Sequence, residues 1–240
     1  MKIEFLGHCA VLFTSDKGKR ILVDPYITNN MAAKIKAEDI TDIDALLITH
    51  AAFDHLGDSV EIAKRTKCQV FTEPATGRYL KTQGIPDEKI SLMIWNMARI
   101  FEGIHIRAVE ARHWSMIDLG YCLHTGMPLG FILHMENGTG VYFGGDTSVF
   151  GDMKLFGELY PVKIGFFGID GAPGHAFAMD GGDAAVAAKL FGVEVAIPMH
   201  YAPGSAQLDS FAQAMKKHAP SVRIEVMSAG DILEFESFCG

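Results

Sequence analysis

Short apolar runs that end at a histidine or an aspartate constrain the fold of this sequence more than any other feature. Asp24 follows the run Ile21–Val23, and His50 follows Ala45–Thr49. Runs of this length, bounded by turn residues, predict buried β-strands. In α/β proteins, ligands bind in the crevice beyond the ends of the strands. The pattern therefore predicts a sheet protein with a polar site at one edge.

The runs alternate with helical patterns after an initial set of hairpins, which indicates an α/β or α+β class. No repeat, low-complexity tract or linker is visible, so residues 1–240 are expected to form a single domain. Two segments, Pro25–Thr41 and Arg112–Pro128, are predicted to be long loops, and long ordered loops often wall a binding site. The predicted strands are Ile3–Leu6, Cys9–Phe13, Ile21–Val23, Ala45–Thr49, Val70–Thr72, Ile104–Glu110, Gly130–Met135, Gly140–Phe143, Ile164–Ile169, Val195–Pro198, Arg223–Val226 and Ile232–Phe235. The predicted helices are Ser59–Thr66, Pro74–Gln83, Asp152–Tyr160, Gly182–Phe191 and Ala206–His218.

Composition narrows the function classes. Of the 240 residues, 49% are apolar and 21% are charged, as in a globular protein that buries a large core. The formal net charge of -8 disfavours binding to nucleic acid or to an anionic membrane, since both need clustered Lys and Arg. The four cysteines form no C-x-x-C pair, and with no signal peptide or membrane span expected they indicate reduced thiols in a cytoplasmic protein. An acidic chain with exposed sheet edges could still form a homo-oligomer.

The segment "ITHAAFDHLGD", residues 48–58, holds His50, Asp54 and His55 in one short turn. His113, Asp146 and His200 come shortly after other predicted strands. Imidazole and carboxylate groups suit zinc, iron or manganese, and a carboxylate can bridge two ions. A single histidine at a strand end is usually an ordinary polar residue, and spacing alone leaves the metal site and that simpler interpretation about equally supported.

The sequence resembles a known family in the segments "THAAFDHLGD", "ARHWS", "GGDTSVFGDM" and "IPMHY". In this order they are similar to the signatures of the metallo-β-lactamase superfamily. The match is closest to the branch of small metal-dependent hydrolases similar to ascorbate-6-phosphate lactonase. It covers nearly the whole chain and implies a four-layer αβ/βα sandwich, in which two packed mixed sheets are flanked by helices.

The resemblance also implies a site for two divalent metal ions, most simply zinc, with manganese and iron as alternatives. Carried over by position, His50 and His113 would hold the first ion. Three other residues would hold the second ion, and one carboxylate would bridge both ions. His8 and Asp24 would orient the ligands from behind. The three residues expected at the second ion are Asp54, His55 and His200, and the expected bridge is Asp146.

Ala52 departs from the family pattern, which has a histidine at this position. Alanine offers no ligand atom, so we expect the site of His50 and His113 to bind its ion more weakly. A natural divergence and an engineered inactivating substitution would leave the same sequence. Because the rest of the motif is intact, an engineered substitution is slightly favoured.

The expected reaction is hydrolysis of a small lactone, ester or phosphoester by a metal-bound hydroxide. Asp54 would hold the hydroxide and pass a proton to the leaving group, and His175 is a candidate donor to the oxyanion. Phe53, Trp114 and Tyr201 are candidate walls of the substrate pocket. For Phe53, a place in the core is an equally good interpretation, and for Tyr201 it is the better one.

Two alternatives remain open at this stage. The first is a degenerate or engineered inactive scaffold that binds one metal or a ligand with little turnover, which Ala52 supports. The second is an oxygen-reducing di-iron protein, which resembles this chain but carries a carboxylate at position 52. The partner is expected to be a small molecule whose identity the sequence does not give.

Overall fold

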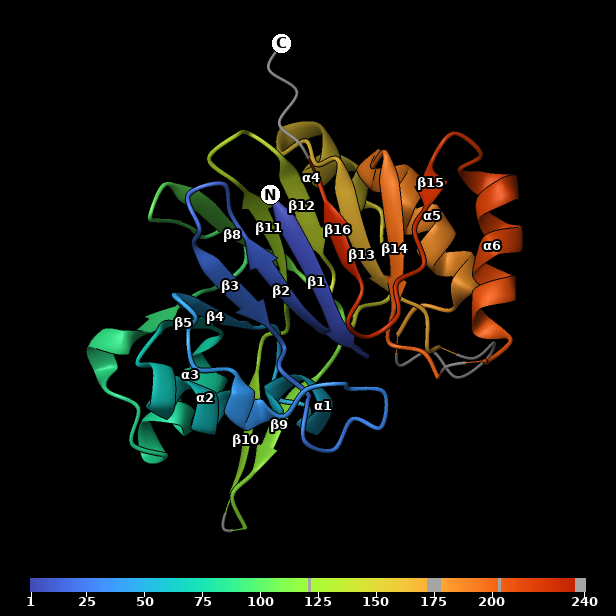
Figure 1. Ribbon diagram of the computed structural model, residues 1–240. Helices are drawn as coiled ribbons and strands as arrows, with labels where there is room; N and C mark the ends of the chain where they lie inside the picture. Colours follow the sequence, from blue (N-terminus) through green and yellow to red (C-terminus); the bar gives the residue numbers. More distant parts are fainter. Residues whose placement is uncertain (121, 172–177, 203, 236–240) are drawn as a thin grey trace.

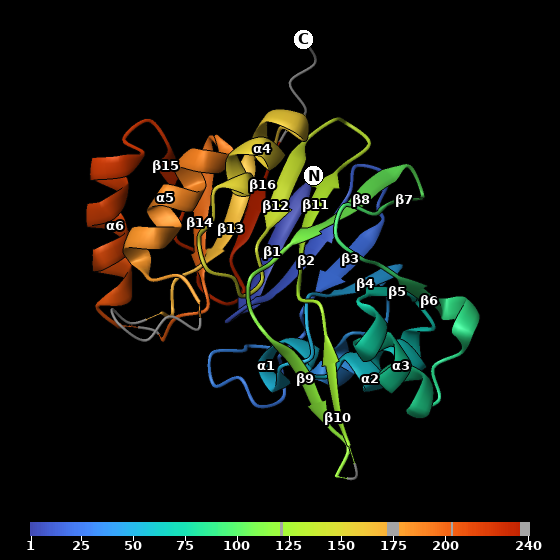
Figure 2. The same ribbon diagram turned by 180° about the vertical axis from the view of Figure 1, so that it is seen from behind.

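The computed structural model describes residues 1–240 except 121, 172–177, 203 and 236–240. Two seven-stranded sheets pack face to face, and helices lie outside them (Figure 1). This arrangement is the four-layer sandwich that the sequence resemblance implied, so the predicted fold class is confirmed. A separate two-stranded hairpin extends from the sandwich (Figure 2).

The first sheet has the order β16-β1-β2-β3-β4-β5-β6. Its pairs are antiparallel from β16 to β3 and parallel from β3 to β6. The parallel half therefore directs the carboxyl ends of consecutive strands to one edge. The strands are β1 Lys2–Gly7, β2 Ala10–Thr14, β3 Arg20–Val23, β4 Ala45–Ile48, β5 Gln69–Thr72, β6 Ile90–Leu92 and β16 Ile232–Glu234.

The second sheet has the order β15-β14-β13-β12-β11-β8-β7. Strands β12 to β15 pair in parallel, while β7, β8, β11 and β12 pair antiparallel. Its parallel half thus also gathers strand ends at one edge. The strands are β7 Ala98–Phe101, β8 Ile104–Glu110, β11 Leu129–His134, β12 Gly140–Phe143, β13 Ile164–Gly168, β14 Val195–Met199 and β15 Arg223–Ile224.

The helices cover the outer face of each sheet (Figures 1 and 2). Two begin with a carboxylate that accepts backbone N–H groups, Glu73 before α3 and Asp180 before α5, as expected of residues that cap a helix. The described helices are α1 Phe53–Leu56, α2 Ser59–Thr66, α3 Pro74–Thr82, α4 Asp152–Leu159, α5 Gly181–Phe191 and α6 Gln207–His218, with the short 3-10 turns η1 Ala37–Asp39 and η2 Asp87–Lys89.

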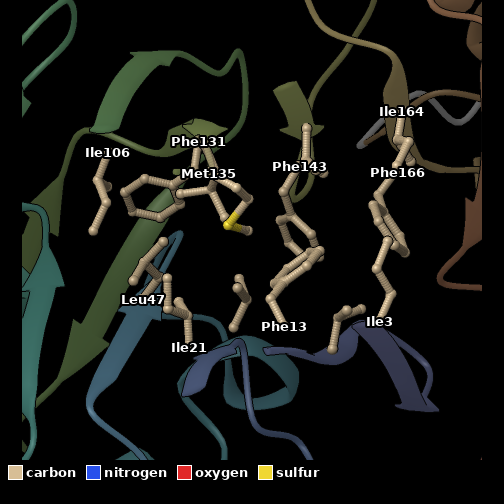
Figure 3. Packing of buried hydrophobic residues seen from close by; sticks show 14 of the residues in the cluster. Ile3, Phe13, Ile21, Leu47, Ile106, Phe131, Met135, Phe143, Ile164 and Phe166 are labelled. Carbon is tan, nitrogen blue, oxygen red and sulfur yellow. The ribbon is translucent and has the colours of Figure 1, made fainter. Parts of the chain in front are cut away.

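The main core lies between the sheets, where side chains from both inner faces interlock (Figure 3). In β2 the side chains alternate: Val11 and Phe13 enter this core, while Ala10 and Leu12 pack in the cluster that holds α2 and α3 residues. A third cluster joins the second sheet to α4, α5 and α6. Three apolar layers therefore hold both sheets rigid behind the edge where the strands end.

Most predicted elements are confirmed to within one or two residues at each end, the usual uncertainty of element boundaries. The loop predicted over Arg112–Pro128 is wrong, because this segment forms the hairpin of β9 Ser115–Asp118 and β10 Leu123–Gly126. Its strands mix polar and apolar residues, and in β9 only Ser115 and Ile117 are buried. Such alternation over four residues is too short to predict a strand. Strands β6 and β7 and helix α1 were also missed.

In the described part of the chain, no helix has the length and apolar character needed to cross a membrane. Cys9, Cys68 and Cys122 are free thiols, and Cys239 lies outside the described residues. Burial raises the pKa of the Cys9 thiol to about 12, so this group stays protonated.

Candidate metal centre

The predicted ligand residues converge on Asp146, which follows β12. Its Oδ1 lies 3.3 Å from Nε2 of His55. Its Oδ2 lies 3.6 Å from Nε2 of His200 and 3.8 Å from Nε2 of His113. These four residues come from both sheets, so the site sits where the two sets of strand ends meet.

His50 completes the cluster beside His55 and His113. Its ring centroid lies 4.2 Å from that of His55 and 5.0 Å from that of His113. Asp54 lies on the opposite side, where its Oδ2 is 3.2 Å from Nε2 of His200. The structure thus brings together all six residues that the sequence singled out as metal ligands.

The donor atoms of this cluster fit a cation. Within the described residues, Nε2 of His50, Nε2 of His55 and Oδ1 of Asp146 are buried and make no hydrogen bond. The close pair between His55 and Asp146 is not aligned for one. Unpaired buried polar atoms are costly, and an ion coordinated by these three atoms would remove that cost.

Among the residues that the structure describes, four sets of three groups place their ligand atoms within 4.8 Å of one another. These sets differ from the predicted ligand groups. His55 lies in a set with His50, whereas the two were expected at different ions, and His8 lies in a set with Asp54, whereas it was expected behind the ligands. His8 therefore lies at ligand distance and not only behind the ligands. The sets are His8, Asp54 and His200; Cys9, Asp24 and His55; His50, His55 and Asp146; and Asp146, Asp170 and His200.

Asp24 and Thr49 hold the two histidines of the motif from behind. Oδ2 of Asp24 lies 2.7 Å from Nδ1 of His55, and the Thr49 hydroxyl donates to the same oxygen. That hydroxyl also lies 3.0 Å from Nδ1 of His50. Nε2 of both rings is thereby directed to the centre, the role predicted for Asp24.

Asp170 is a site residue that the sequence analysis missed. Its Oδ2 lies 3.1 Å from Nδ1 of His200, close enough for an ion pair though not aligned for a hydrogen bond. A signal was available, because Asp170 directly follows the predicted strand Ile164–Ile169 just as His50 follows its own strand. The carboxylate lies behind His200 as Asp24 lies behind His55.

The backbone around the cluster is specialised. His8, Asp24 and His200 have positive φ values of 58°, 43° and 58°. Non-glycine residues adopt this region at a cost, and such strain is concentrated at functional sites. Gly145 also has a positive φ, and a Cβ atom there would lie 2.9 Å from Thr49. Glycine at this position therefore allows Asp146 to approach the motif.

The charges of the cluster are strongly coupled. Burial acts to raise the pKa of Asp146, but His55 and His200 outweigh it and hold that pKa well below its usual range. Burial acts to lower the pKa of His200, but Asp146, Asp170 and Asp54 raise it to about 10. Burial lowers the pKa of His50 well below its ordinary value. Without an ion, His200 carries a proton that a cation would have to displace.

Ala52 begins the short helix α1, and its carbonyl oxygen accepts bonds from the N–H groups of His55 and Leu56. Its side chain faces a hollow and offers no ligand atom. Phe53 and Trp114, both expected at a pocket wall, line this hollow. Their side chains are 76% and 53% exposed. The alternative interpretation of Phe53 as a core residue is therefore wrong.

Buried polar contacts tie α1 to the hairpin. The Ser115 hydroxyl donates to Oε1 of Glu73 at 3.0 Å and accepts from the N–H of Ala51 at 3.0 Å. Glu73 is fully buried and also accepts from the N–H groups of Ala75 and Thr76. The turn that carries His50 is thus fastened to the strand that follows His113.

The other two predicted residues differ in their outcome. Tyr201 is half-buried and lines a hollow together with His8 and His200, next to the cluster. It also packs against the core cluster that joins the second sheet to α4, α5 and α6, so both the pocket-wall and the packing interpretation describe it. His175 lies outside the described residues, and its predicted role as an oxyanion donor stays a prediction.

Comparison with known proteins agrees with this geometry. The family model of the β-lactamase superfamily domain matches residues 19–201. The metallo hydrolase Igni18 from Ignicoccus hospitalis superimposes with a TM-score of 0.83, at 31% identity and over 98% of this chain and 99% of its own. The chain belongs to the metallo-β-lactamase superfamily.

Relatives of similar length indicate to which family within the superfamily the chain belongs. A UPF0173 metal-dependent hydrolase from Rubrobacter xylanophilus is 33% identical over 97% of this chain and 96% of its own length. A second one, from Methanosarcina barkeri, is 38% identical over 84% of this chain and 83% of its own. The protein is therefore a metal-dependent hydrolase of this family.

Proposed function

We propose that this protein hydrolyses a small lactone, ester or phosphoester with the help of divalent ions held at the Asp146 cluster. The observation that carries the proposal is one ionised carboxylate within 3.8 Å of three imidazole nitrogens, beside buried donor atoms that have no other partner among the described residues. That donor set suits zinc best, with manganese or iron as alternatives. The likeness to ascorbate-6-phosphate lactonase stays part of this proposal.

The proposed ligand assignment is the one that the family resemblance implies. His50 and His113 with Asp146 would hold one ion, and Asp54, His55 and His200 with the same Asp146 would hold the other. When bound, such ions lower the pKa of a coordinated water toward neutrality and polarise the bond to be cleaved. The protein supplies the dry floor of the site and the fixed orientation of each donor.

Asp54 is the residue best placed to handle protons. Burial acts to raise its pKa, but His200 and His8 hold it below the usual range, so Asp54 stays a carboxylate. Its Oδ2 lies 3.3 Å from Nε2 of His8, and its side chain is 15% exposed at the mouth of the site. We infer that Asp54 accepts a hydrogen bond from the attacking water and orients it. Its transfer of that proton to the leaving group stays part of the proposal, although the lowered pKa makes Asp54 a weak base.

The test is hydrolysis of a panel of small lactones, carboxylic esters and phosphoesters after loading with zinc or manganese. Bound metal is counted by elemental analysis of the same samples. We expect turnover of one substrate class that disappears with a chelator and returns with the metal. Metal-loaded protein that turns over none of the three classes would overturn the proposal.

A second candidate function is a scaffold that binds one ion and turns over little. Ala52 favours it, because the side chain at this position gives no donor to the ion beside His50 and His113. One bound ion per chain and no hydrolysis, with both properties changed by Ala52→His, would support this alternative.

A further inference from the structure

Two hollows flank the candidate metal centre, and only one of them has residues of the centre among those that form it. One, of about 480 Å³, contains His8, Asp170 and His200 in its wall. Its wall also combines amide and hydroxyl groups from Asn29, Asn30, Gln207 and Tyr26 with the apolar side chains of Met31, Ala32 and Ala202. The other, of about 400 Å³, is formed by Ala51, Ala52, Phe53, Leu56, Tyr79, Trp114, Met116, Ile117 and Asp118.

The second hollow is lined mainly by apolar side chains that water reaches. Phe53, Trp114 and Met116 are 76%, 53% and 38% exposed. Single exposed apolar residues need no explanation, but several around one concave site indicate a binding site for an apolar group. A ligand that covered these side chains would remove apolar surface from water, which favours binding.

A row of aromatic rings links the two hollows across the mouth of the site. Phe53 packs edge-on to Tyr26 at 5.9 Å, and Tyr26 packs edge-on to His8 at 5.4 Å. The His8 ring in turn lies 3.9 Å from that of His200. A small molecule whose reacting group lies near Asp54 can therefore extend into both hollows.

The apolar hollow is held in shape before any ligand arrives. Its floor at Ala51 is hydrogen-bonded to Ser115, which is itself bonded to the buried carboxylate of Glu73. β9 supplies a wall with Met116 and Ile117 and belongs to a hairpin that lies beside α1 in both views (Figures 1 and 2). A pocket with a fixed shape loses little conformational entropy on binding.

We propose that the hollow over Ala52 binds a compact apolar group of the substrate, such as a phenyl or butyl group, while the polar part of the substrate occupies the hollow beside His200. The proposal rests on the proposed function, since it places the bond to be cleaved at the metal centre. Asp118 is the one charged residue among those that form the hollow, and it disfavours an anionic group there. The proposal thus predicts a substrate with one apolar end over Ala52 and one polar end beside His200.

The test measures binding separately from turnover. Methyl-, n-butyl- and phenylphosphonate are suitable probes, because their tetrahedral anionic head resembles the tetrahedral state of ester hydrolysis and their P–C bond is not hydrolysed. The chain has two tryptophans, Trp95 and Trp114, so the variant Trp95→Phe leaves Trp114 in the hollow as the only tryptophan reporter. In zinc-loaded protein we expect binding to tighten roughly twofold to fourfold for each added methylene, with a change in Trp114 fluorescence.

Substitutions then locate the binding site. Met116→Ser removes part of the wall, and Ala52→Leu fills the floor. We expect both to weaken phenylphosphonate binding about threefold to tenfold while methylphosphonate binding changes little. Leu123→Ser is the matched control, because Leu123 lies in the same hairpin and is 56% exposed but does not form the hollow. It should leave both probes unaffected.

Each outcome separates the two proposals. Equal affinity for all three probes, or equal effects of Met116→Ser and Leu123→Ser, would overturn the apolar subsite even if hydrolysis is observed. Chain-length-dependent binding that Met116→Ser weakens would support the subsite even if no ester is hydrolysed. If this face joins two copies of the chain, probe affinity will fall as protein concentration rises, and the subsite assignment is then wrong.

Discussion

The two sides of the candidate metal centre differ in how firmly their histidines are held. On one side, Nδ1 of His55 faces the carboxylate of Asp24 at 2.7 Å and Nδ1 of His200 faces that of Asp170 at 3.1 Å. On the other side, Nδ1 of His50 meets a neutral hydroxyl, that of Thr49, and no carboxylate among the described residues. Carboxylates behind a histidine fix its ring and strengthen it as a ligand.

Position 52 increases this difference. The firmly held side keeps all its predicted ligands, whereas the side of His50 and His113 has an alanine where the family pattern places a histidine. We therefore expect one tightly bound ion near Asp54 and His200 and a weaker one near His50. Four predictions test this asymmetry.

The largest effect is expected from Asp146→Asn, because Asp146 is the group that both sides share. An amide of the same shape lacks the charge that faces three histidines, so both ions should be lost at micromolar metal and hydrolysis should cease. Elemental analysis and the substrate assay measure the two effects. Retention of one tightly bound ion would show that the sides do not depend on a common carboxylate.

Ala52→His should reverse the asymmetry. A histidine here would add a donor to the side of His50 and His113, and we expect the affinity of the weaker ion to rise by more than the tenfold to 100-fold typical of outer partners. Zinc titration with a competing chelator gives both constants. Ala52→Leu is the control for volume alone, and an equal rise in that variant would exclude coordination as the cause.

The sequence predicted the metal centre well because one simple rule places most of its residues. Strand ends in the parallel halves of the sheets meet at one edge, so Asp24, His50 and His200 could be grouped without coordinates. Asp170 obeys the same rule and was missed only because it was not tested against it. The ligand roles themselves rest on the family resemblance.

The hollow over Ala52 could not be predicted in the same way. Its shape depends on Ser115 meeting Glu73, residues 42 positions apart in the chain, and no local pattern indicates that contact. The hairpin that carries Ser115 was read as a loop because its strands are short and mixed in polarity. Exposure of Phe53 likewise follows from tertiary packing, since an aromatic residue in a helix fits a core equally well.

A smaller effect is expected when the residues behind the histidines are changed. Asp24→Asn should weaken the tight ion about tenfold to 100-fold, because the amide no longer strengthens His55. Asp170→Asn should act in the same direction through His200. Thr49→Val should weaken the ion beside His50 most, because it removes the contact to Nδ1 of His50, and should weaken the tight ion less, because Asp24 stays beside His55 after losing the bond from Thr49. Competition titrations with a chelator measure both metal affinities in all three variants, and circular dichroism checks that each variant is folded. If Thr49→Val weakened the tight ion more than Asp24→Asn and Asp170→Asn do, the proposed difference between the two sides would be wrong.

The smallest effect concerns protons and separates the two sides directly. Without an ion the pKa of His200 is about 10, so this ring is protonated at pH 7, whereas burial keeps His50 neutral. Burial acts to lower the pKa of His55, but the carboxylates of Asp146 and Asp24 help to hold it well above its ordinary value. Because metals bind the neutral imidazole, the tight ion should displace a proton from each of His55 and His200, and its apparent affinity should fall steeply as the pH falls below 9. The weaker ion should displace none from His50. Calorimetric titrations of zinc in two buffers with different ionisation enthalpies count the protons released, and equal numbers for both ions would show that the two sides are charged alike.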